Sequence, residues 1–393
     1  MEGEGRRRAV GPAIGASESG AVRGSRPEVP PRLEAVALGF DVVLHAVALG
    51  VNLPGQVGYE RRVGRDEEEV GGTRAGRSSP TELSVCPRAF GSPEAAASRR
   101  EPPASAGVVE TLTPGLMRDR VVVPAMPSVT RDGVAIDYAV DGDPDGPTVL
   151  LLEGLGYGRW MWRWLAEALA DDYEVLRPDN RGTGDSDVPE GPYTVAEMAA
   201  DAAAVLDDRG VDAAHVCGAS MGGMIAQELA LADDRVASLT LLCTSPGGDE
   251  ATPTPPAVQE HIFSVAEDAD PRERIRYLME PAVSDGFYDR EPELVDRIVD
   301  WRLAGDATPT GREAQAAAVA AFDASDRLGD LSVPTLVLHG TADRVLPVEN
   351  ADLLAELLPH AEVERFEGGP HLFFVEERER VNERVRSFLG EVA

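Results

Sequence analysis

Apolar residues in the last two thirds of the chain follow two alternating patterns. Short runs rich in Val, Leu and Ile predict buried strands, and longer stretches with apolar residues every three to four positions predict amphipathic helices. We expect a leading hairpin over 128–138, then strands at 148–152, 173–177, 214–218, 236–243, 335–339 and 361–366. Helices are expected at 161–169, 195–208, 221–231, 348–358 and 372–389. This alternation predicts an α/β fold with a mostly parallel, doubly wound sheet.

The alternation stops between Ser245 and about Leu328, where the sequence becomes helical, acidic and punctuated by prolines. We therefore expect a helical lid, or cap, at about 246–328. An insertion at this point of the fold would overhang the carboxyl ends of the strands and help to shape a ligand site there. Its aromatic residues are expected to pack mainly within the lid itself: Phe287, Tyr288 and Trp301.

Residues 1–125 differ in composition from residues 126–393. They contain clusters of Arg, Gly, Pro, Ala and Ser, and their apolar residues do not recur with a sustained period of 2 or 3.6. We therefore expect them to be disordered. The one apolar stretch, 33–53, is interrupted by charge and is too short to span a bilayer, and it does not resemble a signal peptide. We interpret Met126 as the natural start of the protein and the preceding segment as an extension whose deletion should leave function intact.

The formal net charge of −32 belongs entirely to residues 126–393, which hold 21 arginines against 53 acidic residues and no lysine. Such a charge repels itself at low ionic strength and predicts a cytoplasm of high salt concentration. It argues against nucleic acid or an anionic membrane as a partner. Cys86, Cys217 and Cys243 form no disulfide framework, which fits a reducing interior. Nothing in the sequence indicates an oligomer.

A serine lies between two glycines where the strand at 214–218 meets the helix at 221–231. The segment Gly218-Ala219-Ser220-Met221-Gly222 has the G-x-S-x-G pattern of a nucleophile elbow. So tight a turn strains the backbone of its central residue and leaves room only for glycine two positions away on either side. It would expose the Ser220 hydroxyl and place the Met221 amide at a helix N-terminus, where it can donate to an oxyanion.

An acid and a histidine follow in the order expected of a catalytic triad. Asp343 comes just after the strand at 335–339, and His371 lies in a loop after the strand at 361–366. Because the carboxyl ends of parallel strands share one edge of the sheet, we expect Ser220, Asp343 and His371 to converge there. His215 and His339 lie within apolar runs and are interpreted as core residues. The loop 179–186, with Arg181, is expected to brace the floor of the site.

The segment 126–393 resembles α/β-hydrolases of the cap-bearing serine esterase and lactonase type. The resemblance is carried by the blocks 150–156, 179–186, 218–223, 338–343 and 368–371. It implies Ser220 as nucleophile, His371 as general base and Asp343 as its orienting acid, with the Leu155 and Met221 amides binding the oxyanion. One departure is Glu153-Gly154, where the family commonly has His-Gly, because a carboxylate close to a forming oxyanion would be unfavourable unless it is neutral or turned away.

The function we expect is hydrolysis of a small carboxylic ester or lactone through an acyl-enzyme, without a metal or an organic cofactor. Cofactor-free perhydrolase or haloperoxidase-like chemistry, carbon–carbon bond hydrolysis and acyl transfer to an alcohol remain open. A non-catalytic ligand receptor is an alternative from another functional class, and Glu153 is the feature that supports it. Little in the sequence supports a scaffolding role. The expected pocket walls are Met221, Phe373 and one of Trp160, Trp162 and Trp164.

Overall fold

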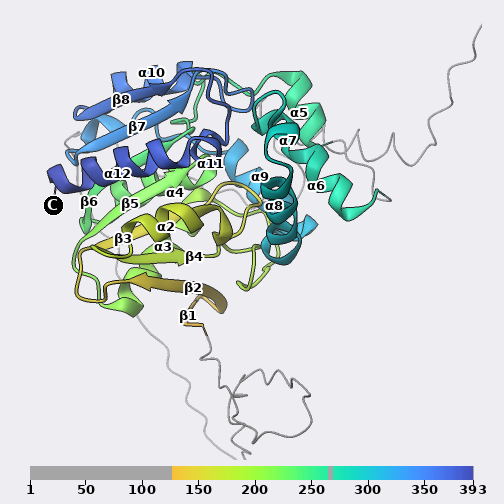
Figure 1. Cartoon of the computed structure of the whole chain (residues 1–393). Coiled ribbons are helices and arrows are strands. Elements are labelled where there is room, and N and C mark those ends of the chain that lie inside the picture. Colours follow the sequence, from red (N-terminus) through yellow and green to blue (C-terminus); the bar gives the residue numbers. More distant parts are fainter. Residues whose placement is uncertain (1–125, 264–268, 393) are drawn as a thin grey trace, which may run out of the picture. The chain divides into compact units, whose positions relative to one another are not determined.

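The computed structural model describes residues 126–263 and 269–392, so the predictions made for residues 1–125 lie outside the described residues. Within them an eight-stranded sheet has the order β1-β2-β4-β3-β5-β6-β7-β8 (Figure 1). The strands are β1 (Ser128–Arg131), β2 (Val134–Gly142), β3 (Thr148–Leu152), β4 (Glu174–Pro178), β5 (Ala214–Ala219), β6 (Val236–Leu242), β7 (Thr335–Gly340) and β8 (Ala361–Phe366). Each predicted strand is present, with ends that differ by one residue at most after the leading hairpin.

The first two strands form the predicted hairpin. They pair antiparallel from Arg131 opposite Val134 outwards, across a turn in which Asp132 and Gly133 both have positive φ angles of 51° and 84°. β2 also runs antiparallel to β4, whereas β4, β3, β5, β6, β7 and β8 are parallel to their neighbours. The parallel part therefore brings the loops after six strands to one edge, which is where an α/β fold places its ligands.

Helices cover both faces of the sheet because the strand side chains alternate. Leu150 and Leu152 of β3 belong to one hydrophobic cluster, and Val149 and Leu151 belong to the other. The first cluster includes residues of α3 (Val195–Arg209), α4 (Met221–Ala232) and α10 (Glu349–Leu357). The second includes residues of the 3-10 helix η1 (Arg159–Trp162), α2 (Arg163–Leu169), α11 (Phe373–Glu376) and α12 (Arg378–Val392). This is the doubly wound arrangement that the sequence predicts.

Two helices that we expected to be continuous are each divided. The stretch 161–169 becomes η1 followed by α2, and the stretch 372–389 becomes α11 followed by α12. Both short leading elements bury three consecutive large residues, Trp160–Trp162 and Phe373–Val375. Consecutive residues of one straight helix point about 100° apart and cannot all face the same core. A change of axis lets each short segment sit inside the core and the following helix lie along its surface.

Between β6 and β7 the regular elements among the described residues are all helices. They form α5 (Pro256–Phe263), α6 (Pro271–Met279), the 3-10 helix η2 (Glu280–Ala282), α7 (Phe287–Arg290), α8 (Pro292–Gly305) and α9 (Pro309–Ala320), followed by the 3-10 helix η3 (Leu328–Asp330). Figure 1 shows α5 to α9 gathered at one side of the sheet. Among the described residues no helix is both long and apolar enough to cross a lipid bilayer.

Candidate active site

Ser220 occupies a sharp turn between β5 and α4. Its φ and ψ angles are 55° and −119°, a strained conformation for a residue with a side chain. Neighbouring backbone makes the turn possible only with glycine on either side. A Cβ atom at Gly218 would collide with the Gly222 carbonyl, and one at Gly222 would collide with the Leu152 carbonyl of β3. The elbow predicted from the G-x-S-x-G pattern is thus present in the backbone.

Hydrogen bonds from the neighbouring strand hold the elbow in place. The Ser220 N–H donates to the Leu242 carbonyl at 2.9 Å, and the Thr244 hydroxyl donates to the Ser220 carbonyl at 2.6 Å. The Ser220 side chain makes no capping bond to α4 and remains half-buried. Its hydroxyl is consequently not used in maintaining the turn.

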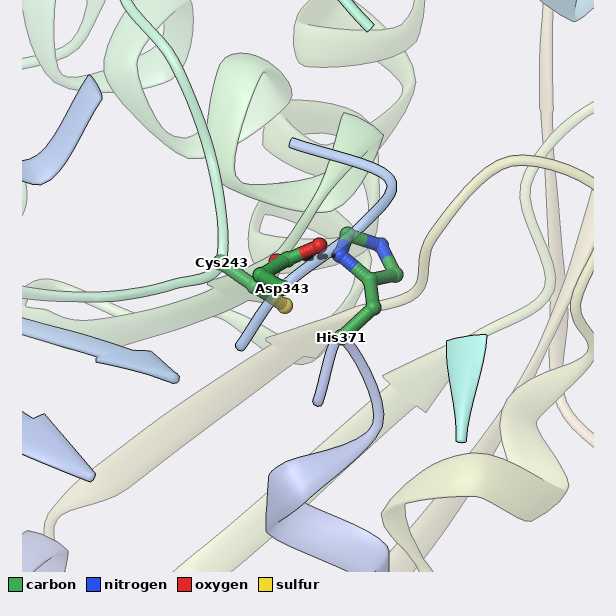
Figure 2. Close-up of side chains that lie close together, drawn as sticks. All are labelled: Cys243, Asp343 and His371. Atoms are coloured by element: carbon green, nitrogen blue, oxygen red, sulfur yellow. Dashed lines mark hydrogen bonds and ion pairs between the residues drawn. The ribbon is translucent and has the colours of Figure 1, made fainter. Parts of the chain in front are cut away.

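Asp343 and His371 are hydrogen-bonded to each other. Nδ1 of His371 lies 2.7 Å from Oδ2 of Asp343, and both residues are buried (Figure 2). The other carboxylate oxygen, Oδ1, accepts from the backbone N–H groups of Val345 and Leu346 at 2.8 and 2.9 Å. Burial would raise the pKa of Asp343, but the charge on His371 and hydrogen bonds from His339 and His371 outweigh it and lower the pKa to about 2. Asp343 is thereby kept ionised beside the imidazole.

The buried Cys243 thiol lies beside this pair. Sγ of Cys243 and ligand atoms of Asp343 and His371 all lie within 4.8 Å of one another (Figure 2). Burial first, and then the charge of Asp343, raise the pKa of Cys243, while the backbone N–H of Ser220 opposes that rise. The elbow and the Asp343–His371 pair therefore flank the same thiol. Among the described residues, no hydrogen bond joins the side chains of Ser220 and His371.

The proximity of these three side chains also suits a metal ion by distance alone. A metal would require the Cys243 thiolate, and the raised pKa of this thiol disfavours that form. It would also compete with the 2.7 Å bond between His371 and Asp343. The chemistry of the donor set favours an imidazole oriented by a carboxylate.

Two backbone N–H groups are available beside the elbow. No described residue accepts a hydrogen bond from the N–H of Leu155, which follows β3, or of Met221, the first residue of α4. The turn containing Leu155 packs close to the elbow, since a Cβ built on Gly154 would lie 3.5 Å from the Ser220 Cβ. These are the two donors named from the sequence.

Glu153, the unusual residue of this turn, is completely buried. Its Oε1 accepts from the Asn180 N–H at 2.5 Å, and the Asn180 side chain donates to the Glu153 carbonyl at 3.2 Å. Oε2 has no hydrogen-bond partner among the described residues. Burial first, and then the charge of Asp179, raise the pKa of Glu153 well above its usual value. Burial therefore disfavours the charged form of this carboxyl group, which is engaged with the loop after β4.

Buried ion pairs brace the loop after β4. Asp179 accepts from the N–H and the guanidinium of Arg159, and Arg181 binds Asp201 of α3 through two hydrogen bonds of 2.6 and 2.9 Å. This agrees with the bracing role expected of the loop 179–186.

Three residues of the site could not be assigned from the sequence. His339 was interpreted as a core residue and is fully buried, yet its Nε2 lies 3.3 Å from Oδ2 of Asp343. Cys243 had no motif around it. Gln315 of α9 accepts from the Gly156 N–H at 2.8 Å and donates to the Arg181 carbonyl at 2.9 Å. Only the spacing of four residues between His339 and Asp343 offered a signal.

The residues expected as pocket walls belong largely to the core. Phe373 and Met221 are 0% and 1% exposed. Trp162 stacks on Phe374, whereas Trp160 and Trp164 both contact Trp301 of α8. The tryptophans of η1 and α2 thus connect the sheet domain to the helices between β6 and β7.

Residues 147–378 match the family model described as alpha/beta hydrolase fold, and the chain belongs to this family. It is 34% identical over 266 residues to a protein of Azorhizobium caulinodans named "Putative carbamate hydrolase RutD", covering 65% of this chain and 98% of the relative. The structure of the enol-lactonase from Burkholderia xenovorans LB400 has a TM-score of 0.61 and 25% identity, covering 67% of this chain and 100% of that one. The esterase RhEst1 from a Rhodococcus species has a TM-score of 0.59 and 30% identity, covering 68% and 98%.

The names of these relatives are those of a carbamate hydrolase, an enol-lactonase and an esterase. Together with the family match over residues 147–378, they identify the chain as an enzyme of the α/β-hydrolase fold.

Proposed function

We propose that this protein is a serine hydrolase that cleaves a small carboxylic ester or lactone with Ser220, His371 and Asp343. The observation that carries the proposal is the strained Ser220 elbow together with the Asp343–His371 pair, both bordering Cys243. The 2.7 Å bond at Nδ1 leaves Nε2 of His371 available to a hydroxyl or a substrate. In the absence of substrate, catalytic hydrogen bonds are commonly long, so a lack of direct Ser220–His371 bonding is compatible with this role.

The proposed reaction has two steps. His371 accepts the Ser220 proton as the hydroxyl oxygen attacks the substrate carbonyl, and it then returns that proton to the leaving alkoxide. The acyl group remains on Ser220. In the second step His371 takes a proton from water, the resulting hydroxide attacks the acyl-enzyme, and the proton goes back to Ser220. Asp343 stabilises the imidazolium in both steps because its carboxylate stays ionised.

The N–H groups of Leu155 and Met221 would bind the oxyanion formed in each step. They are free of other described acceptors, and Met221 opens α4, where the helix dipole favours negative charge. The replacement of the usual histidine by Glu153 does not oppose this, because burial raises the pKa of Glu153 and disfavours a negative charge next to the oxyanion. Glu153 therefore no longer favours a non-catalytic receptor.

We further propose that residues 246–328 act as a cap over the site. α9 approaches the loops after both β3 and β4: Gln315 bonds to Gly156, and Gly311 lies against Gly182. α8 contacts η1 through Trp301 and Trp160. Helices in this position would limit the size of the acyl group that enters.

The test is labelling by a fluorophosphonate and turnover of p-nitrophenyl esters, methyl esters and lactones in molar salt. We expect labelling at Ser220, and we expect Ser220→Ala to lower kcat by a factor on the order of 10⁶. Ser325→Ala is the matched control, because Ser325 bonds only to Asp323 in a loop remote from the elbow in sequence. A chain that is folded but neither labelled nor active would favour the receptor.

A further inference from the structure

Arg312 of α9 is a half-buried arginine that has no counter-ion among the residues that the structure describes. Within residues 126–263 and 269–392 its guanidinium forms neither a hydrogen bond nor an ion pair. Burial first, and then the charge of Arg302, lower the pKa of Arg312. In contrast, Arg159 and Arg181 each bind buried carboxylates. Burying an unpaired cation costs free energy. Residues 126–393 contain 53 acidic residues that could have paired with it, so the unpaired state of Arg312 suggests a function.

The Arg312 side chain lies against the turn that carries a proposed oxyanion donor. Its Cγ, Cδ and Nη1 atoms are 3.6 to 3.8 Å from where a Cβ on Gly156 would be, and Gly156 directly follows Leu155. A hydrogen bond holds α9 against this turn, because Gln315, one turn further on, accepts from the Gly156 N–H at 2.8 Å. The cation is thus fixed at the boundary between the cap and the site.

Tyr157, in the same turn as Gly156, interacts with the arginines of the cap helices. Burial is the main cause that raises the pKa of the Tyr157 hydroxyl; the charge of Arg302 lowers it, that of Asp306 raises it, and Arg312 and Cys243 have smaller, opposing effects. The Arg302 guanidinium stacks 4.3 Å over the Tyr157 ring. Tyr157, which follows Gly156 in the turn after β3, therefore lies in the electrostatic field of both arginines.

Asp306, the carboxylate that binds Arg302, does not neutralise both arginines. Asp306 binds Nε of Arg302 at 2.6 Å through Oδ2, and its Oδ1 accepts from Trp160 Nε1 and the Gly158 N–H at 2.9 and 3.3 Å. Nη1 of Arg302 remains buried without a partner among the described residues. Two guanidinium groups share one fully engaged carboxylate, which leaves an excess positive charge beside the turn.

We propose that Arg312 is a specificity-determining residue that binds a carboxylate carried by the acyl part of the substrate, an inference that rests on the proposed function. The guanidinium fork matches a carboxylate in two parallel hydrogen bonds, and a partly desolvated setting strengthens such a pair. The substrate class is then an ester or lactone of a dicarboxylic acid. Its second carboxylate supplies the counter-ion that Arg312 lacks, and it places the scissile carbonyl at the Leu155 turn.

The experiment compares two p-nitrophenyl esters of similar shape, mono-p-nitrophenyl adipate with a free carboxylate and p-nitrophenyl heptanoate without one. The quantity measured is the ratio of kcat/KM for adipate to that for heptanoate, at one salt concentration. We expect Arg312→Gln to lower this ratio about ten- to a hundredfold, mainly through KM for adipate, and Arg312→Lys to retain part of it. Arg386→Gln is the control for net charge, because Arg386 forms an exposed pair with Asp172.

The outcomes separate the two levels of the proposal. A wild-type chain that is labelled at Ser220 and hydrolyses both esters, with a ratio unchanged in Arg312→Gln, would overturn the role of Arg312 alone. An equal fall of the ratio in Arg386→Gln would also overturn it, because the effect would then be general electrostatics. A wild-type chain that is not labelled and hydrolyses neither ester would overturn the proposed function and this inference with it.

Discussion

Glu153 shows how one residue can depart from a family pattern without disturbing the backbone chemistry next to it. Its side chain does not replace the oxyanion donor, which is a backbone N–H. Instead it connects the ends of β3 and β4 through Asn180. A buried carboxyl group that is hydrogen-bonded through one oxygen and unpaired at the other is tolerable only when it is neutral.

The protonation of Glu153 predicts a specific pH dependence of stability. Its folded-state pKa is raised, so above an unfolded pKa of about 4.3 unfolding releases a proton that the folded state retains. The stabilising effect is complete below that pH and is lost as pH rises. We expect the free energy of unfolding of the wild type, minus that of Glu153→Gln, to fall as pH rises above the unfolded pKa, by up to about 1.4 kcal/mol per pH unit, until the folded-state pKa is passed.

Urea unfolding at several pH values measures this difference. Glu383→Gln is the matched control, because Glu383 is exposed on α12 and should give a difference that hardly changes with pH. A difference for Glu153→Gln that stays constant or grows with pH would mean that Glu153 is ionised in the folded state.

At the scale of elements, α9 is the helix that joins residues 246–328 to the edge of the sheet where the candidate active site lies. Three of its residues contact that edge within a little over one turn: Gly311 lies against Gly182, Arg312 against Gly156, and Gln315 bonds to both loops. The absence of a side chain at Gly311 allows the helix to approach the loop after β4 this closely.

We therefore expect Gly311→Ala to destabilise the protein by about 1–3 kcal/mol, the usual cost of overpacking. The added Cβ would collide with the Gly182 carbonyl, which belongs to the backbone and cannot easily move aside. Gly305→Ala at the end of α8 is the control, since its Cβ would meet nothing within 4 Å. Thermal unfolding of the two variants tests this, and equal melting temperatures would show that α9 is not seated as described.

At the scale of the molecule, the dominant property is a net charge of −32. Many arginines are already committed to ion pairs, such as Arg235 with Asp233 and Asp207, and Arg327 with Glu228. Residues 126–393 hold 53 acidic residues against 21 arginines, so many carboxylates have no arginine to pair with. Their mutual repulsion favours expansion of the chain.

Salt should relieve this repulsion, because the screening length falls from about 10 Å at 0.1 M to about 3 Å at 1 M. We expect the melting temperature to rise steeply between low and molar NaCl. Sucrose at matched osmolality is the comparison, since it stabilises proteins without screening charge. A melting temperature that does not depend on NaCl would contradict the prediction of a high-salt environment.

Most of the framework could be predicted from local patterns. Periods of 2 and 3.6 identify β8 at its observed bounds and the other parallel strands to within a residue, and the G-x-S-x-G pattern predicts the Ser220 turn. Chain order and position at strand ends were sufficient to nominate Asp343 and His371, which the structure joins. The breaks after Trp162 and Glu376 could not be predicted, because both depend on which core receives three consecutive large side chains.

What the sequence alone decides is the set of elements and the loops at their ends, because spacing along the chain fixes which side chains share a face. The electrostatic character of the site depends on contacts between residues far apart in the chain. Gly156 meets Gln315 across 159 positions, and Glu153 meets Asn180 across 27. Whether Glu153 is neutral or Arg312 unpaired depends on desolvation and on neighbours brought by other elements, and only the tertiary structure determines these.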